Sequence, residues 1–302
     1  MQIRAGSIPA FGTISLFAAF PTLMMNTTLI VYALNAESEL KNNLSGYISN
    51  FFSIIIVDDG SVDETAPYID THFKGIKLIR HQARIGYAAS INHAMMQVET
   101  RFAVICVPET RFISLPHVGD KYAFDGSHGI ILPAHSDFVL TTTRSRICCD
   151  TDSVFKQAIC VNREQFIHLG GLDALCFAFG YEWVDFLYRF EKRGWHIKRD
   201  ALWKIECQFQ SQSLKNDIRP DTLKARNEIV FNWKNRDGLS FWLLHVLDIV
   251  MSMVTFQLRT IRGVFLGIFA LFKVRKSRLS RLPTILSDCE LAFKFKKGIS
   301  FK

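Results

Sequence analysis

The sequence predicts an α/β fold with a mostly parallel central sheet and helices on both faces. From Thr27 onward, short apolar runs alternate with helical patterns, and this alternation is typical of parallel sheets built from β-α-β units. The chain has 302 residues, of which 49% are hydrophobic. We therefore expect one large core with an appended segment.

The expected elements follow one another regularly as far as residue 107. Strands are predicted at residues 27–33, 53–57, 76–80 and 102–107, and helices at residues 37–50, 62–73 and 87–98. Ser61 and Glu64 have the spacing of a capping box, which predicts a helix start directly after the second strand. Residues 110–160 show weaker periodicity. Two further helices are expected at residues 163–169 and 181–193, each followed by glycine.

The second strand runs into two adjacent carboxylates in the stretch SIIIVDDGSVDET, residues 53–65. An Asp-Gly pair after a strand is also a common turn. However, ligands of open α/β sheets bind beyond the carboxyl ends of the strands. Asp58 and Asp59 are therefore candidates for recognition of a polar ligand.

Several classes of protein are disfavoured by composition. The 7 cysteines are scattered and odd in number, which predicts a reducing compartment and neither a disulfide framework nor a zinc site. No spacing typical of a nucleic-acid-binding module is present, so we expect no nucleic acid partner. Residues 1–26 contain an apolar stretch interrupted by proline and glycine, and we expect a weakly ordered N-terminal extension.

The C-terminal region combines apolar runs with basic charge. Residues 239–258 are nearly long enough to span a bilayer but contain His245 and Asp248, and the run at residues 264–272 is too short. Residues 249–287 contain no acidic residue and seven basic ones. We expect amphipathic helices that bind a membrane surface through residues 239–281. A soluble helical subdomain and a true span remain alternatives.

Four segments in this order resemble the family 2 glycosyltransferases: VDDGSVDET, RHQARIGYAASINHA, FAVICVPET and GGLDALCFAFGYEWVDFLYRFEKRGW. The resemblance extends from Thr27 to about Ile197 and implies a GT-A fold and an inverting enzyme that uses a nucleotide-sugar donor. RNEIVFNWKN and the late LSDCEL look like the C-terminal region of the rhamnosyltransferase-like branch of cell-surface polysaccharide biosynthesis. The implied domains are a catalytic domain at residues 27–212 and a helical, basic, membrane-associating region at residues 213–302.

The resemblance also implies roles for individual residues. The implied contacts to the nucleotide are Tyr32, Asn35, Asp58, Asp59, Arg84, Gly86 and Asn92. Glu109, in the sequence VPE, stands where the family holds a divalent cation, Mg²⁺ or Mn²⁺. The partners implied are a UDP-, dTDP- or GDP-sugar donor and a glycan or lipid-linked acceptor, at the cytoplasmic face of the cell membrane.

The catalytic base is the main departure from the family pattern. Trp183 stands where the family has the acid that deprotonates the acceptor, and Gln208 stands where it has a histidine. Because Glu182 and Asp185 are three residues apart on one helix, both can face one pocket. We predict Glu182 as the base, with Asp185 as a second catalytic candidate that alternatively pairs with Arg189. The other hypotheses are a degenerate relative that binds nucleotide or a partner transferase without turnover, and an unrelated nucleotide-binding protein such as a nucleotidyltransferase.

Overall fold

The computed structural model describes residues 27–115, 128–133, 141–143, 146–148, 158–177, 180–207, 220–235, 250 and 258–279. In these ranges a central sheet has the strand order β10-β6-β9-β4-β1-β2-β3. Its strands are β1 (Thr27–Ala33), β2 (Ser53–Asp58), β3 (Lys77–Arg80), β4 (Phe102–Cys106), β6 (His128–Pro133), β9 (Ile159–Asn162) and β10 (His196–Asp200).

The sheet is mostly parallel, as predicted. β1 pairs in parallel with β2 and β4, β2 with β3, and β10 with β6. β9 is antiparallel to both of its neighbours, β4 and β6. Every residue of β1 and β4 is buried, which explains why these strands read as continuous apolar runs rather than alternating patterns.

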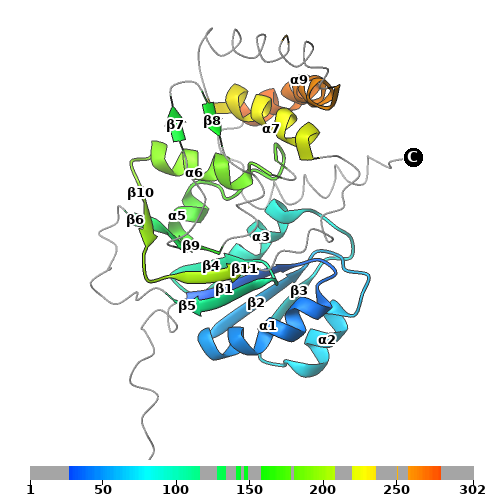
Figure 1. Ribbon diagram of the computed structural model, residues 1–302, viewed down its shortest axis with the longest axis vertical. Coiled ribbons are helices and arrows are strands. Elements are labelled where there is room, and N and C mark those ends of the chain that lie inside the picture. The colour runs from blue at the N-terminus through cyan, green and yellow to red at the C-terminus, as the bar shows by residue number, and fades with distance from the viewer. Residues whose placement is uncertain are drawn as a thin grey trace, which may run out of the picture.

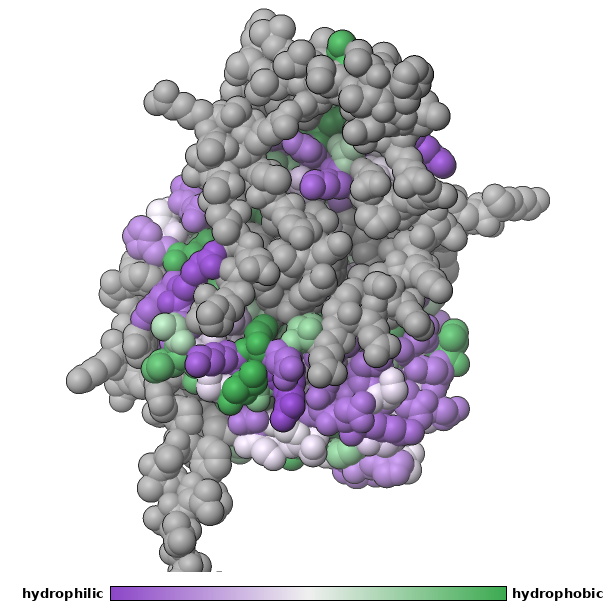
Figure 2. Space-filling model, in the orientation of Figure 1, coloured by the Kyte–Doolittle hydropathy of each residue, from purple (hydrophilic) through white to green (hydrophobic). Residues whose placement is uncertain are grey.

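Helices cover both faces of the sheet (Figure 1). On one side α1 (Glu37–Asn50) and α2 (Thr65–His72) lie over a core that includes Leu40 and Ile69. On the other side α3 (Tyr87–Met96), α5 (Arg163–His168) and α6 (Glu182–Lys192) lie over a second core rich in aromatic residues. In Figure 2 the lower part of the molecule, over α1 and α2, is mostly hydrophilic, as expected for solvent-facing helix surfaces.

The predicted capping box is wrong. α2 begins at Thr65, and its N-cap residue Glu64 makes no capping hydrogen bond through its side chain. Instead Ser61 Oγ accepts a hydrogen bond from the backbone N–H of Asn35 at 2.9 Å. The physical reason is tertiary: Ser61 lies in the turn after β2, where its hydroxyl joins the turn after β1, and α2 begins four residues later.

Seven of the described strands, all between residues 110 and 207, were not predicted: β6, β9 and β10 join the central sheet, and the other four form two small sheets. β5 (Thr110–Ser114) pairs with β11 (Lys204–Cys207) in a small antiparallel sheet, and β7 (Thr141–Thr143) pairs with β8 (Arg146–Cys148). These strands have three to five residues each. Such segments are too short for a two-residue periodicity to be distinguished from a loop.

Beyond α6, the described residues include the helices α7 (Pro220–Asn235) and α9 (Leu258–Leu279) (Figure 1). They pack closely because α9 presents glycines to α7. A Cβ atom added at Gly263 would lie 2.8 Å from Ala225 Cβ, and one at Gly267 would lie 3.0 Å from Ile229 Cβ. Within the described ranges, no helix is both long and apolar enough to cross a bilayer. The predicted segment at residues 239–258 lies almost wholly outside those ranges.

Candidate functional site

The carboxyl ends of four strands meet at one edge of the sheet. Ala33 at the end of β1 pairs with Asp58 of β2, and Asp58 pairs with Arg80 of β3. On the other side of β1, Val31 pairs with Cys106, the last residue of β4. The topology therefore brings the turns after β1, β2, β3 and β4 together, as ligand sites in α/β sheets require.

Asp59 organises this edge. The Tyr32 hydroxyl and the Gly86 N–H each donate to Asp59 Oδ2 at 2.9 Å, and the Ile85 N–H donates to Oδ1 at 2.7 Å. His81 Nδ1 lies 3.3 Å from Oδ1. Burial alone would raise the pKa of Asp59, yet these donors together lower it. Asp59 is thus an ionised carboxylate that fixes the loop after β3 against the end of β2.

Asp58 has a different environment. Its Oδ1 accepts the Ser61 N–H at 2.9 Å, which closes the turn after β2. Its Oδ2 is buried without a hydrogen-bond partner among the described residues, and Arg80 Nε lies 3.7 Å away. A carboxylate oxygen in this state can accept a further hydrogen bond. Asp58 therefore keeps one acceptor, whereas both oxygens of Asp59 are in use.

The loop at residues 81–86 passes directly over the turn after β2. Gly60 has φ +80°, and a Cβ there would lie 2.8 Å from Arg84 N. Only glycine permits both this backbone conformation and this close approach. Arg84 is near enough to the Tyr32 hydroxyl to lower its pKa, although burial and Asp59 raise it well above its usual value overall.

Asn35 and Asn92 have structural partners. Asn35 has a left-handed backbone with φ 51°, and its Oδ1 accepts the Val62 N–H at 2.9 Å. The Asn92 side chain donates to Leu172 O at 2.7 Å and accepts from Leu172 N at 2.9 Å. Asn92 thereby joins α3 to the loop that leads to α6. Direct nucleotide contacts by these residues stay predictions.

Glu109 follows β4 and lines a cavity beside α1. The cavity has a volume of about 610 Å³, and its lining includes Glu39, Asn43, Tyr47, Arg111 and Glu206. Burial and the nearby charge of Glu39 raise the pKa of Glu109. The described residues contain no cluster of three or more histidine, cysteine or acidic side chains arranged as a metal site. Glu109 suits a cation that is otherwise held by substrate phosphates, because Mg²⁺ often takes only one or two protein carboxylates.

Glu182 opens α6 and is only 2% exposed. Its Oε1 has no hydrogen-bond partner among the described residues. Burial raises the pKa of Glu182 to about 8, although the backbone N–H groups of Glu182 and Gly180 oppose this shift. A carboxyl group with its pKa near the working pH has the property expected of a general base.

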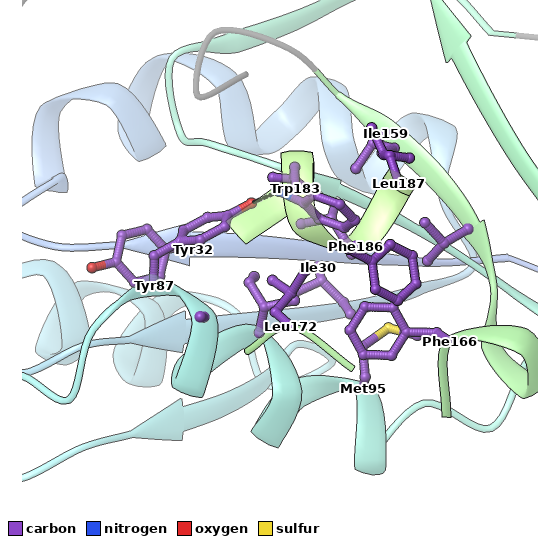
Figure 3. Packing of buried hydrophobic residues seen from close by; sticks show 14 of the residues in the cluster. Ile30, Tyr32, Tyr87, Met95, Ile159, Phe166, Leu172, Trp183, Phe186 and Leu187 are labelled. Atoms are coloured by element: carbon purple, nitrogen blue, oxygen red, sulfur yellow. Dashed lines mark hydrogen bonds between the residues drawn. The ribbon is translucent and has the colours of Figure 1, made fainter. Parts of the chain in front are cut away.

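Trp183 belongs to the core (Figure 3). It is 2% exposed and packs with Phe166 and Phe186. Its indole Nε1–H donates to the Tyr87 hydroxyl at 2.9 Å, and the Tyr87 ring meets that of Tyr32 edge-on at 5.0 Å between centroids. Trp183 therefore supplies packing at the position where the family pattern has an acid.

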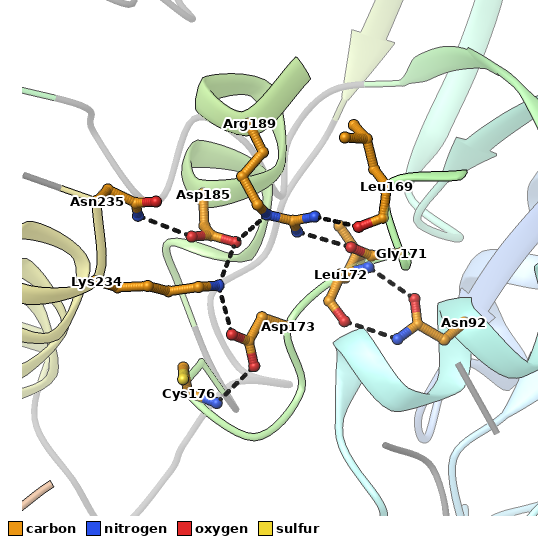
Figure 4. Close-up of polar contacts among 10 residues, drawn as sticks. All are labelled: Asn92, Leu169, Gly171, Leu172, Asp173, Cys176, Asp185, Arg189, Lys234 and Asn235. Carbon is orange, nitrogen blue, oxygen red and sulfur yellow. Dashed lines mark hydrogen bonds and ion pairs between the residues drawn. The ribbon is translucent and has the colours of Figure 1, made fainter. Parts of the chain in front are cut away.

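Asp185 lies in a buried ionic cluster (Figure 4). Its Oδ2 is 2.8 Å from Arg189 Nε and 3.0 Å from Lys234 Nζ, and its Oδ1 accepts from Asn235 Nδ2 at 2.9 Å. Burial would raise its pKa, but Lys234 and Arg189 lower it to about 2. The expected pair with Arg189 is confirmed. Both carboxylate oxygens of Asp185 are in use, whereas Glu182 Oε1 has no hydrogen-bond partner among the described residues.

Sequence reasoning missed the part that α7 plays. Lys234 also contacts Asp173 Oδ2 at 2.5 Å. About two turns earlier, in the middle of α7, Arg226 Nη1 donates to Cys176 O at 2.6 Å and Asn227 Nδ2 donates to Gly180 O at 3.0 Å. The paired polar residues at both ends of RNEIVFNWKN were the available signal, but their distant partners cannot be read from spacing.

Residues 28–107 match the sequence model of Glycosyl transferase family 2. No curated protein matched the sequence. The chain is similar in structure to GalNAc-T7 with UDP, GalNAc and Mn²⁺, with 12% identity and a TM-score of 0.52 over 65% of this chain and 45% of that chain. The chain thus spans less than half the length of GalNAc-T7.

Two further solved structures have lower TM-scores. The mannosyltransferase PcManGT from Pyrobaculum calidifontis, in complex with GDP-Man and Mn²⁺, shares 15% identity and a TM-score of 0.48 over 92% of this chain and 88% of that chain. Glucosyl-3-phosphoglycerate synthase from Mycobacterium tuberculosis, with Mn²⁺, UDP and phosphoglyceric acid, shares 16% identity and a TM-score of 0.43 over 68% and 75% of the two chains. The chain has a GT-A-like α/β fold, and its residues 28–107 match the glycosyl transferase family 2 model.

Proposed function

We propose that this protein is an inverting glycosyltransferase that moves a sugar from a nucleotide-diphosphate donor to a hydroxyl group of a glycan or lipid-linked acceptor. The observation that carries the proposal is the combination of the family match at residues 28–107 with a buried carboxyl group, Glu182, whose pKa is about 8. GalNAc-T7 and PcManGT, which have similar structures, were solved with UDP and with GDP-Man, respectively. Both are consistent with a nucleotide-sugar donor.

The donor nucleotide binds at the edge formed by the turns after β1, β2 and β3. Asp58 Oδ2, which has no hydrogen-bond partner among the described residues, accepts a hydrogen bond from the base or ribose. Asp59, Gly86 and Tyr32 hold the loop that carries Arg84, so this loop is set before the donor arrives. Arg84 provides positive charge near the phosphates.

Glu109 is the residue that would hold a divalent cation, Mg²⁺ or Mn²⁺. Its carboxylate is partly desolvated and close to the negative charge of Glu39, and a cation would relieve that repulsion. When bound, such a cation neutralises charge on the leaving diphosphate. Glu109→Gln should therefore abolish any Mn²⁺-dependent gain in nucleotide affinity.

The chemical step is a direct displacement at the anomeric carbon. Glu182, in its ionised form, takes the proton from the acceptor hydroxyl while that oxygen attacks the anomeric carbon. The bond from this carbon to the diphosphate oxygen breaks, and the nucleoside diphosphate leaves. A single displacement inverts the configuration and needs no covalent sugar intermediate.

We further propose a peripheral location at the cytoplasmic face of the cell membrane, in the rhamnosyltransferase-like branch of cell-surface polysaccharide biosynthesis. Phe265 and Phe269 on α9 are 52% and 68% exposed, and Leu266 and Ile268 beside them are also exposed. Basic residues flank this apolar surface in the sequence of α9. An amphipathic helix of this kind suits an anionic lipid surface.

The position of Trp183 favours a second candidate function, nucleotide binding without turnover. The test is to incubate the protein with a panel of UDP-, GDP- and dTDP-sugars plus Mn²⁺ and to measure nucleoside diphosphate release. Release from one donor is expected, slowly even without an acceptor. Nucleotide binding without release from any donor would contradict transfer and support the second candidate.

A further inference from the structure

Helix α7 contacts the loop before α6 at two separate points. Asn227 and Lys234 are seven residues apart, which is about two turns, so they lie on the same face of α7. At one point Arg226 and Asn227 bind the carbonyl groups of Cys176 and Gly180. At the other, Lys234 and Asn235 bind carboxylates at Asp173 and Asp185. We call residues 173–177 and 180–182 the base loop, because they lead to Glu182.

The base loop has a backbone that needs such support. Gly180 has φ +75° and Tyr181 has φ +70°, so two consecutive residues are left-handed directly before Glu182. A left-handed tyrosine is unfavourable and persists only where its surroundings hold it. The bond from Asn227 to Gly180 O is one such restraint, and Lys234 restrains both flanks of the loop, at Asp173 and at Asp185.

Lys234 also neutralises negative charge at both Asp173 and Asp185. Asp185 is buried and Asp173 is half-buried, and Lys234 Nζ lies 2.5 Å from an Asp173 oxygen and 3.0 Å from an Asp185 oxygen (Figure 4). Arg189 binds Asp185 and also donates to the Leu169 and Gly171 carbonyl groups. Two carboxylates are thus balanced by two cations, and of these two only Lys234 contacts both carboxylates.

We propose that Lys234 is a positioning residue that holds the base loop, and through it Glu182, in the geometry needed for proton transfer. This rests on the proposed function and adds to it a residue far outside residues 28–107. Lys234 touches neither donor nor acceptor in this account. Its effect should therefore appear in kcat rather than in the donor KM.

The experiment compares three variants. Lys234→Met removes the cation and leaves the carboxylates of Asp173 and Asp185 with one partner cation, Arg189, which contacts Asp185. Asp173→Asn/Lys234→Met restores the charge balance but not the connection between α7 and the base loop. Lys224→Met is the matched control, because Lys224 is an exposed residue of the same helix. The measurements are thermal unfolding, hydrogen exchange of residues 173–182 by mass spectrometry, and kcat and donor KM.

A positioning role predicts a separation of stability from turnover. Lys234→Met should lower the Tm and kcat, the latter at least tenfold with the donor KM changed less than threefold. The double variant should regain most of the Tm, yet keep exchange of residues 173–182 at least tenfold faster than wild type and kcat at least tenfold lower. Lys224→Met should match wild type.

Two results would overturn the inference. One is a double variant in which turnover returns together with stability, since charge balance alone would then be the role of Lys234. The other is unchanged hydrogen exchange of residues 173–182 in both Lys234 variants. The exchange measurement does not depend on activity. A wild-type protein without turnover but with accelerated exchange in the variants would contradict the proposed function and leave Lys234 as the residue that holds the loop.

Discussion

Carboxyl groups that are close together in this sequence differ in their hydrogen bonds and in their pKa shifts. Asp59 is fully engaged by protein donors, whereas Asp58 keeps one buried oxygen without a hydrogen-bond partner in the described structure. Glu182 is neutral near pH 7 because burial raises its pKa to about 8, whereas Asp185, one turn later, stays ionised because Lys234 and Arg189 outweigh its burial. Two carboxyl groups within one helical turn therefore have opposite pKa shifts, the pattern by which paired carboxyl groups take different roles.

The raised pKa of Glu182 makes folding stability depend on pH. Its folded pKa, about 8, lies above its usual value of 4.5. The folded state therefore binds the proton more tightly, and stability falls as pH rises from about 4.5 to about 8, by a few kcal/mol. Glu182→Gln removes this dependence. Urea unfolding at pH 6 and pH 8.5 should show that the variant is more stable than wild type at pH 8.5. If the free energy of unfolding changes equally with pH in both proteins, a buried, neutral Glu182 is contradicted.

Replacing Trp183 by an acidic residue should lower the stability of the protein and should not raise its turnover. Trp183→Asp removes a buried indole, the hydrogen bond to Tyr87 and its packing on Phe186, at a cost of about 3–5 kcal/mol, and it adds a buried charge. Trp183→Phe, which keeps most of the volume, should lose only about 1–2 kcal/mol. Denaturant unfolding measures both. A folded Trp183→Asp protein with higher turnover would show that this position still serves catalysis.

Among the elements, the regular alternation of strands and helices as far as residue 107 could be predicted, whereas β6, β9 and β10 of the same sheet were not predicted. The predictions for β1 and α1 match their observed bounds. The short strands β5, β7, β8 and β11 were missed because so few residues carry no clear period. The capping box failed because Ser61 bonds Asn35, a partner 26 residues away.

In the candidate site too, features that are local in the sequence could be predicted and contacts between distant residues could not. The strand-end residues Asp58 and Asp59 could be predicted because a strand end is a local feature of the sequence. The ionic cluster around Asp185 could be predicted only in part: its pair with Arg189 has helical spacing, whereas Lys234 is 49 residues away. Contacts across such separations depend on the fold and leave no pattern in one sequence.

The close packing of α9 against α7 predicts the effect of replacing Gly263 by alanine. A Cβ at Gly263 would lie 2.8 Å from Ala225 Cβ and closer still to Thr222 O. Gly263→Ala should therefore force the helices apart and destabilise the protein by about 1–3 kcal/mol. Gly46→Ala on α1 is the control: nothing lies within 4 Å of the added methyl group, so it should stabilise by up to about 1 kcal/mol. If thermal unfolding shows that both variants change stability in the same direction relative to wild type, the close packing of α7 and α9 is contradicted.

The molecule carries different surfaces on the two sides of its central sheet (Figure 1). α1 and α2 form a mostly hydrophilic surface (Figure 2). α9 lies beyond α6 and carries exposed aromatic residues in an excess of positive charge. A membrane bound at α9 would lie on the same side of the sheet as Glu182, which suits a lipid-linked acceptor.

Membrane binding through α9 can be measured by flotation with vesicles that contain anionic lipid. Phe265→Asp/Phe269→Asp should lower the bound fraction at least tenfold, because two exposed aromatic rings are lost and two negative charges face the lipid. Phe52→Asp is the matched control, since Phe52 is 80% exposed at the end of α1. Equal loss in both proteins, or none in either, would contradict docking through α9.

Under the proposed function, this chain transfers sugar with Glu182 as the base. The most direct test is the rate of acceptor-dependent nucleoside diphosphate release by wild type and Glu182→Gln at pH 8.5, with a donor that both proteins bind equally. Loss of a general base predicts a rate at least about 100-fold lower in the variant, with donor affinity unchanged. A variant that turns over at the wild-type rate would contradict the assignment.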